Sequence, residues 1–535
     1  MDPRRLLLAV ALCMAVLFGW NWFFPPQPQL LTGNQIVQTP DSQSRLVTAT
    51  LTPPITSTDQ EHFEWPTVTV VTPIYTAVFH TNGGVLKEFK LAHYKHSIAP
   101  NSPKVDLIGS QALSKAPMGL LFNGKATWRQ TGWTVSGGDL NLSPGQQGLL
   151  VFTADIDGLR LIRKFTFAAD KYLIHESAQL YNGRSTNMPS RFTFTMAAQS
   201  LSQPEDKYNL TRIAFLNATG SHEESSDDKL IKGLTDSNGV LWGGLSSNFF
   251  LLALTPPRSQ SETIFKAQLK DHIYQVTMDC NLGNLNPSAE AVGECDYYLG
   301  PKDTHILSDM PNNLDKAINL GVFKAVANPL LWLLHFFQRF VNNWGIAIIL
   351  LTIVVKLVLY PLSYKSYKSM EQMKKLQPML TKIRNKYKDD RQKMNEETMA
   401  LYKTYKINPA GGCWPMLLQV PVFIGLYQAL MNSIDLRHAA FITCLPLTNL
   451  VWLADLSVKD PFYITPIIMG ATMFIQQKMT PTSGDPTQAK VMLFMPIIFT
   501  FMFLGLPSGL VLYWLVSNIL SIAQQHWMIR NVKTD

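Results

Sequence analysis

The chain has 535 residues, of which 46% are hydrophobic and 16% are charged, whereas a soluble domain carries roughly 25% charged residues. Its mean hydropathy of +0.04 averages a long polar region and a C-terminal part with five apolar stretches. The charge is divided as well, because residues 25–320 hold 23 Lys+Arg and 27 Asp+Glu while the whole chain has a net charge of +8. This distribution excludes a soluble enzyme, a disordered chain and a small disulfide-stapled protein.

The first predicted element is a membrane helix at the N-terminus. Leu6–Phe24 contains no charged residue, follows Arg4 and Arg5, and stops at Pro25. No small-residue cleavage site precedes the proline, so an uncleaved anchor fits better than a signal peptide. We expect residues 1–24 to be a transmembrane anchor with its N-terminus in the cytoplasm. Residues 25–60 are rich in Pro, Gln, Ser and Thr, which predicts a flexible linker.

Residues 61–318 have the pattern of a β-domain. Residues 75–80 and 85–90 alternate in polarity around an Asn-Gly turn, which predicts a hairpin. Residues 159–167 and 172–180 alternate in the same way around a second turn. Many short strands over this length predict one large antiparallel sandwich.

The sequence contains few motifs for a disulfide, a nucleotide site or a metal site. Cys280 and Cys295 lie in the β-region and could form a disulfide if that region is in an oxidising compartment. The run from Gly119 to Ala126 nearly matches a phosphate-binding loop, but Ala126 lacks the hydroxyl that would hold magnesium. No metal-ligand spacing is present, so we expect no metal, no cofactor, no catalytic residue and no small-molecule substrate.

Residues 319–341 are apolar but interrupted by Lys324, His335 and Arg339, which favours an amphipathic helix lying in the membrane interface. Five spans follow, predicted at Ile346–Leu362, Trp414–Ile434, Phe462–Gln476, Val491–Leu506 and Gly509–Gln525. With the anchor they predict a multi-domain membrane protein: an α-helical core at 342–529 and a large outer β-domain.

Charge predicts the orientation of these spans. The segment 365–406 carries 12 Lys+Arg and 5 Asp+Glu, and the positive-inside rule places such a loop in the cytoplasm. The loop 478–490 and the short tail 530–535 then lie in the cytoplasm too, and the β-domain lies outside. Making 320–340 another span would put the most basic loop outside, so we reject that topology.

Lys356 is the most informative residue, because it is a cation within the first of the five spans. Placing Lys in hydrocarbon costs on the order of 2.5–3.5 kcal/mol, and none of the five spans contains Asp or Glu. One interpretation is that the side chain extends to the cytoplasmic interface. A second is a neutral, buried Lys, which would waste a costly residue. The third is a wet groove open to the cytoplasm, in which the cation meets an incoming anionic group.

Polar residues at helical spacing favour the groove. Thr352, Lys356 and Tyr360 repeat every four residues and would share one helix face. The predicted polar lining of the groove is completed by Gln419, Gln428, Asn432, Tyr513, Ser517 and Asn518, with Ser521 and Gln524 beside them. Hydrogen bonding between helices in a closed bundle is the alternative explanation.

The segment 365–406 is predicted to form a helical hairpin. Its first apolar stripe comprises Met370, Met373, Leu376, Leu380, Ile383 and Tyr387, and its returning stripe comprises Met394, Leu401 and Tyr405. We expect its exposed cations to contact cytoplasmic partners; these are Lys374, Lys375, Lys382, Arg384 and Lys386. A self-packed, solvated hairpin is the simpler interpretation of the stripes.

Long motifs in the helical part resemble the YidC family of bacterial membrane protein insertases. They lie at Asn343–Gly345, Tyr360–Leu362, Asn408–Phe423, Asp460–Ile464 and Leu506–Asn518. The resemblance implies a five-helix core with a groove open to cytoplasm and lipid, an outer β-super-sandwich and a mobile cytoplasmic hairpin.

The resemblance also implies client contacts along two spans and the groove. The expected contact residues are Pro415, Pro421, Phe423, Met495, Phe499 and Tyr513. The groove cation is usually Arg in this family, and Lys356 keeps the charge but loses the bidentate fork.

We therefore expect an insertase and folding chaperone of the inner membrane, acting alone or beside the Sec translocon. Its expected partners are nascent membrane proteins, the ribosome, the Sec translocon and phospholipids. The alternatives are a solute transporter with an outer sugar-binding sandwich, and a scaffold without a groove.

Overall fold

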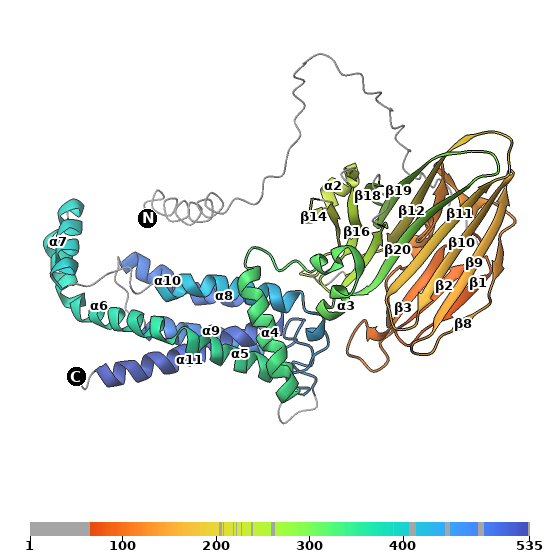
Figure 1. Ribbon diagram of the computed structural model, residues 1–535. Coiled ribbons are helices and arrows are strands. Elements are labelled where there is room, and N and C mark those ends of the chain that lie inside the picture. The colour runs from red at the N-terminus through yellow and green to blue at the C-terminus, as the bar shows by residue number, and fades with distance from the viewer. Residues whose placement is uncertain are drawn as a thin grey trace, which may run out of the picture. The chain divides into compact units, whose positions relative to one another are not determined.

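The computed structural model describes residues 65–532, apart from 203–205, 207, 218, 221, 226, 237–238, 258–262, 389, 406–413, 445–449 and 480–485. The predicted anchor at 1–24, the linker at 25–60 and residues 533–535 of the tail lie outside the described residues. The described chain begins with strands and ends with helices (Figure 1).

The strands between Thr67 and Pro301 form three sheets. The five-stranded sheet has the order β4-β3-β2-β1-β8 and contains β1 (Thr67–Val71), β2 (Tyr75–His80), β3 (Leu86–Lys95), β4 (Lys104–Asp106) and β8 (Leu140–Asn141). The nine-stranded sheet has the order β14-β13-β16-β17-β20-β11-β10-β9-β7 and contains β7 (Thr134–Ser136), β9 (Gln147–Ile156), β10 (Leu159–Ala168), β11 (Leu173–Asn182), β13 (Arg212–Asn217), β14 (His222–Ser225), β16 (Val240–Ser246), β17 (Phe250–Thr255) and β20 (Glu290–Pro301). The six-stranded sheet has the order β15-β18-β19-β12-β5-β6 and contains β5 (Leu120–Phe122), β6 (Lys125–Ala126), β12 (Met188–Ala198), β15 (Leu234–Asp236), β18 (Thr263–Lys270) and β19 (Ile273–Leu285).

Both predicted hairpins are confirmed. β2 pairs antiparallel with β3, and β10 pairs antiparallel with β11. Burial alternates along β10 because successive side chains of a strand point to opposite faces. One hydrophobic core draws residues from all three sheets, among them Val68, Phe165 and Phe192. The sheets therefore pack face to face around a shared core.

The β-domain also contains a buried ion pair that the sequence pattern did not predict. Arg163 on β10 and Glu176 on β11 are both completely buried, and Arg163 Nε lies 2.6 Å from Glu176 Oε1. The guanidinium also donates to the carbonyls of Gly83 and of Met118, the latter at 2.7 Å. The second oxygen of Glu176 accepts from the Tyr297 hydroxyl at 2.7 Å. Every charge in this network thus has close partners.

The possible disulfide between Cys280 and Cys295 is not formed. Both are buried free thiols, and they lie in different sheets, Cys280 on β19 and Cys295 on β20. Burial raises the pKa of the Cys280 thiol to about 12 and that of Cys295 well above its ordinary value. Both side chains therefore stay protonated and pack as small apolar groups.

The long helices follow in the second half of the chain, and short helical elements lie both before and among them. The short elements are η1 (Ser110–Lys115), η2 (Thr127–Arg129), α2 (Asp227–Lys232), α3 (Thr304–Ser308), η3 (Pro311–Ala317) and η5 (Ile434–Leu436). The longer helices are α4 (Lys324–Val341), α5 (Trp344–Val358), α6 (Tyr360–Lys386), α7 (Arg391–Thr404), α8 (Trp414–Met431), α9 (Ile464–Met479), α10 (Pro486–Phe503) and α11 (Ser508–Val532). Each of the five predicted spans overlaps one of α5, α8, α9, α10 and α11.

The first predicted span, Ile346–Leu362, is not one straight helix. α5 ends at Val358, and α6 begins at Tyr360 after a bend of 63°. Pro361 explains the break, because it has no backbone N–H to donate to the carbonyl of Leu357. The predicted span therefore ends four residues early, and Tyr360 belongs to the next helix.

Length and composition do not confirm the predicted count of five spans. Over the residues that the structure describes, no helix taken singly has both the length and the apolar character to cross a membrane. The bent pair α5 and α6 passes that test when the two are taken together. Residues 419–431 and 492–503 form shorter apolar helices.

The helices pack as a bundle in which α11 contacts α5, α8 and α9, and α4 contacts α5 and α8. Figure 1 shows α5, α9 and α11 running side by side. Their shared core includes Leu351, Leu426, Met469, Val511 and Tyr513. α10 contacts α9 and leaves most of its apolar side chains exposed.

Candidate functional site

Lys356 lies in the last turn of α5 and points to α11. Its Nζ donates to Ser521 Oγ at 2.8 Å, and Ser521 Oγ donates in turn to the Ser517 carbonyl at 2.8 Å. The Tyr367 hydroxyl on α6 also hydrogen-bonds to Ser521. None of the ion pairs formed by the described residues includes Lys356. The cation is thus half-buried with neutral oxygen partners.

The polar stripe of α11 is buried and hydrogen-bonded. Ser517, Asn518 and Ser521 are each less than one-tenth exposed. Asn518 Nδ2 donates to Thr472 Oγ1 at 3.4 Å, which links α11 to α9. Gln525, one turn beyond Ser521, is buried too and donates to the Met479 carbonyl at 3.1 Å. The polar stripe predicted from the sequence ended at Ser521 and Gln524, although the four-residue period extends to Gln525.

Tyr513 joins the stripe from the core of the bundle. It is 1% exposed, and its hydroxyl accepts from Gln419 Nε2 of α8 at 2.5 Å. Gln419 and Tyr513 were both predicted to line the groove, and the structure brings them together. A direct client contact by Tyr513 is not available in this arrangement, because neighbouring side chains cover it.

Thr352 and Tyr360 do not join Lys356 on one open face. Thr352 is completely buried, and its hydroxyl donates to the Ile348 carbonyl of its own helix at 2.7 Å. Tyr360 follows the bend after α5 and is exposed, with its ring 6.3 Å from that of Tyr364. The predicted stripe was wrong for Tyr360, because the four-residue period holds only within a continuous helix.

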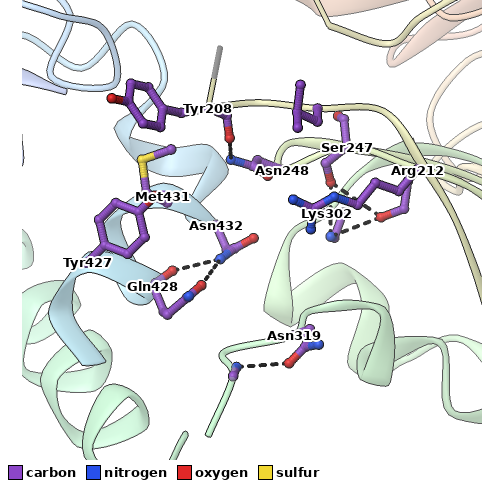
Figure 2. Close-up of a pocket in the computed structure, with 13 residues that line it drawn as sticks. Tyr208, Arg212, Ser247, Asn248, Lys302, Asn319, Tyr427, Gln428, Met431 and Asn432 are labelled. Atoms are coloured by element: carbon purple, nitrogen blue, oxygen red, sulfur yellow. Dashed lines mark hydrogen bonds between the residues drawn. The ribbon is translucent and has the colours of Figure 1, made fainter. Parts of the chain in front are cut away.

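Gln428 and Asn432 belong to a different site. Asn432 Nδ2 donates to the Gln428 carbonyl at 2.9 Å and to Gln428 Oε1 at 3.3 Å (Figure 2). Both residues line a cavity of about 230 Å³ whose other walls include Tyr208, Arg212 and Lys302. Gln419 and Gln428 are nine residues apart, roughly 13 Å along a helix. The structure therefore divides the predicted polar lining between two places.

The other predicted client-contact residues lie on α8 and α10. Phe423 is half-buried, with its ring 4.6 Å from that of Trp514 at 89°, and Pro421 is half-buried beside it in sequence. Met495 is exposed and Phe499 is half-buried. Pro415 lies in the first turn of α8, whose side chains are outside the described residues.

α10 presents a broad apolar surface. Its exposed side chains are Met492, Leu493, Phe494, Met495, Ile497, Ile498, Phe501 and Met502. Exposed apolar patches of this kind mark membrane or protein contact sites. The sequence predicted an apolar span here, and the structure shows that most of its circumference is uncovered.

The hairpin of α6 and α7 packs on a small core of its own. Met373, Leu376 and Leu380 are buried against Tyr402 of α7. The first predicted stripe is thus confirmed for these three residues, whereas Tyr402 takes the place expected for Tyr405. The predicted contact residues Lys374, Lys375, Lys382 and Lys386 are exposed, and Arg384 is half-exposed. Their charges are thus accessible from solvent.

Comparison with known proteins covers nearly the whole chain. Residues 67–333 match the family profile described as the YidC periplasmic domain, and residues 336–535 match that of the 60Kd inner membrane protein. The membrane protein insertase YidC of Maridesulfovibrio salexigens is 50% identical over 541 residues and covers 100% of both chains. That of Nitratidesulfovibrio vulgaris strain Miyazaki F is 49% identical, covering 99% of this chain and 100% of the relative. A crystal structure named as an active YidC insertase, with its first transmembrane domain resolved, matches at 20% identity over 85% of this chain and 91% of that chain, with a TM-score of 0.37.

Proposed function

The chain belongs to the YidC family of membrane protein insertases, and we propose that the polar core around Lys356 is where it receives the hydrophilic segments of its clients. It is an insertase of the inner membrane with a periplasmic β-domain, and it acts on nascent membrane proteins without being an enzyme. Family membership also decides against the solute transporter that the sequence left open.

The single observation that carries this proposal is the partner of Lys356. A half-buried cation next to a serine hydroxyl at 2.8 Å has a weaker electrostatic partner than a carboxylate would supply. An acidic group that enters from the cytoplasm would therefore gain a charge-assisted hydrogen bond without displacing an ion pair. Ser517, Asn518 and Ser521 are buried on the same helix and make the surroundings of the cation polar.

The apolar part of a client would follow a second surface. The uncovered side chains of α10, together with Phe423 of α8, offer apolar contact to a client helix beside the polar core. Transfer of that helix into lipid is driven by burial of its apolar surface. An acidic tail is also pulled outward by the membrane potential, at about 2.3 kcal/mol per charge per 100 mV.

We also propose the topology that follows from charge: an N-terminal anchor and five spans, with both chain ends and the α6–α7 hairpin in the cytoplasm. The bend at Pro361 supports it, since the bend separates the apolar α5 from the cationic α6. α4 would lie in the outer interface, where Trp332, Phe336 and Phe340 are exposed on one face.

The remaining partners are proposed from the hairpin. Its accessible cations suit RNA on the ribosome and anionic phospholipids, and the Sec translocon remains a proposed co-worker for larger clients. Deleting residues 371–397 should abolish complementation of a depletion strain while the protein still integrates into membranes. Full complementation by the deletion would contradict the role of the hairpin.

Charge reversal at Lys356 tests the groove. Lys356→Glu should reduce insertion of a client with an acidic translocated tail by roughly tenfold or more, because attraction becomes repulsion. Lys356→Arg keeps the charge and should stay near wild type. The measurement is protease protection of radiolabelled client in inverted vesicles that contain equal amounts of each variant.

A matched client supplies the control. The same client with a neutral tail should respond much less to Lys356→Glu, because the charge term is absent. Equal loss for both clients would show that Lys356 serves only the fold. Photocrosslinkers at Phe423 and Met495 should capture a stalled client, whereas one at the buried Val511 should not.

A further inference from the structure

The serine hydroxyl beside Lys356 has no hydrogen-bonding capacity left for a client. Ser521 Oγ accepts from Lys356 Nζ at 2.8 Å and donates its proton to the Ser517 carbonyl at 2.8 Å. The Tyr367 hydroxyl also hydrogen-bonds to Ser521, and it is the donor there because the one proton of Ser521 is already used. A serine hydroxyl offers one donor and two acceptor lone pairs. Ser521 therefore holds the ammonium in place but does not itself bind the client.

The ammonium keeps donors that the protein does not use. A lysine ammonium has three N–H groups, and Lys356 Nζ donates to Ser521 alone among the residues that the structure describes. The side chain is half-buried, so its remaining N–H groups are partly withdrawn from water. Donors that lose water without gaining an acceptor cost free energy. An acceptor that reaches Lys356 would remove that cost.

The amide of Gln524 is a second unused donor on the same face of α11. Its Nε2 is buried and has no hydrogen-bond partner within the described part of the chain. Ser517, Ser521 and Gln524 follow one another at spacings of four and three residues, which places neighbouring Cβ atoms about 5–6 Å apart on one helix face. α11 contacts α5 and α6, so this face meets the helices that carry Lys356 and Tyr367. Two sets of unused donors thus lie one helical turn apart.

We propose that Lys356 and Gln524 together bind one carboxylate of a client, with the ammonium at one oxygen and the Gln524 amide at the other. This inference rests on the proposed role of Lys356 and adds the residue that fixes the orientation of the bound group. An ammonium is a point charge without the planar fork of a guanidinium. An Asp or Glu carboxylate accepts at two oxygens, so the adjacent amide supplies the second, directional hydrogen bond that Lys lacks.

Substitutions at Gln524 test this arrangement in the vesicle insertion assay. Gln524→Met keeps the size of the side chain and removes the donor, so insertion of the acidic-tailed client should fall roughly fivefold. The neutral-tailed client should change little. Gln524→Glu should impair the acidic-tailed client more, because it gives Lys356 a carboxylate in place of that of the client. Gln525→Met is the matched control, since Gln525 donates instead to the Met479 carbonyl of α9, and it should affect both clients alike.

The residue at position 356 separates binding from packing. In Lys356→Arg the guanidinium supplies both donors, so adding Gln524→Met should reduce insertion of the acidic-tailed client by less than about twofold. An undiminished fivefold loss in that background, or an equal loss for both clients, would show that Gln524 acts through packing and would overturn the inference. If Lys356→Glu impairs the acidic-tailed client and Gln524→Met does not, the cation acts without the amide. If neither substitution impairs it, the proposed role of Lys356 fails as well.

Discussion

Two cations taken out of bulk water have opposite surroundings in the two halves of this protein. Arg163, in the β-domain, is completely buried and has Glu176 Oε1 at 2.6 Å, two backbone carbonyls and the ring of Phe165 at 4.8 Å from its guanidinium carbon. Lys356, in the helical bundle, is half-buried and has the Ser521 hydroxyl at 2.8 Å. Ser521 is 165 positions from Lys356 in the sequence, whereas Glu176 lies 13 positions from Arg163 on the neighbouring strand.

The difference separates a structural charge from one that is available to a ligand. A buried ion pair with all its hydrogen bonds satisfied would gain little free energy by binding a ligand. A cation whose partners are neutral oxygens is not neutralised, so its charge can still attract an anionic ligand. The β-domain thus uses its charge to order a core, and we propose that the charge in the bundle stays available to a client. Substitutions at and near each charge test this contrast.

Removing Arg163 should cost most. Arg163→Met leaves Glu176 buried without its cation, which should lower the free energy of unfolding by about 3–5 kcal/mol. Denaturant unfolding of the purified full-length protein, followed by tryptophan fluorescence, measures it. Arg160→Met, on the exposed face of the same strand, should stay within about 0.5 kcal/mol of wild type. A small loss of unfolding free energy in Arg163→Met would show that Arg163 is not a structural charge, and the contrast with Lys356 would not hold.

The helical half also contains a satisfied buried carboxylate, outside the polar core. Asp460 accepts from Trp452 Nε1 at 3.0 Å, from the backbone N–H of Phe462 at 3.0 Å, and from the N–H and hydroxyl of Thr465, both at 2.7 Å. Asp460→Ala should lower the free energy of unfolding by about 2–4 kcal/mol, because it leaves these donors unsatisfied. Asp435→Ala, at an exposed pair with His335, should cost less than about 1 kcal/mol.

Giving Lys356 a carboxylate would make it resemble Arg163. Ser521→Asp should reduce insertion of an acidic-tailed client roughly fivefold, because the new partner competes with the client. Ser521→Asn has similar size without the charge and should have a smaller effect. The same vesicle insertion assay compares them at matched protein levels. Full activity of Ser521→Asp would show that an available cation is not required.

The smallest effect concerns an exposed pair beside the buried one. His175 Nδ1 lies 2.7 Å from Asp296 Oδ1, and this hydrogen bond raises the pKa of His175 above its usual value. Its stabilisation is present below the unfolded pKa of about 6.5 and is lost as pH rises through the folded pKa. Because His175 is 43% exposed, solvent screens the pair to less than about 1 kcal/mol.

Unfolding from pH 6 to pH 8 measures that contribution. His175→Gln should remove the extra stability of the wild type at pH 6 and leave pH 8 unchanged. A large difference at pH 8 would mean that His175 acts through packing instead of charge. His175 is next to Glu176 in the chain. The exposed pair of His175 with Asp296 can therefore be compared directly with the buried pair of Glu176 with Arg163.

Local patterns made much of the architecture predictable. Alternation around an Asn-Gly turn is enough to predict the β2–β3 hairpin, because the pleat fixes the side-chain period and only a few turns join adjacent strands. The apolar stretches predicted the helices of the bundle. The cation Lys356 and the stripe of Tyr513, Ser517 and Ser521 were visible for the same reason, since a helix repeats every 3.6 residues.

What the sequence determined by itself is therefore two β-hairpins, the apolar helices of the bundle, the family motifs and the presence of a cation among apolar residues. Only the tertiary structure decided that Ser521, 165 positions away in the sequence, accepts a hydrogen bond from Lys356. The same is true of the position of Gln428 in a separate cavity and of Cys280 and Cys295 as free thiols. Local periodicity is set by the backbone of a few residues, whereas these contacts depend on how distant segments pack. A bend of 63° at Pro361 was enough to remove Tyr360 from a face that the spacing alone had assigned to it.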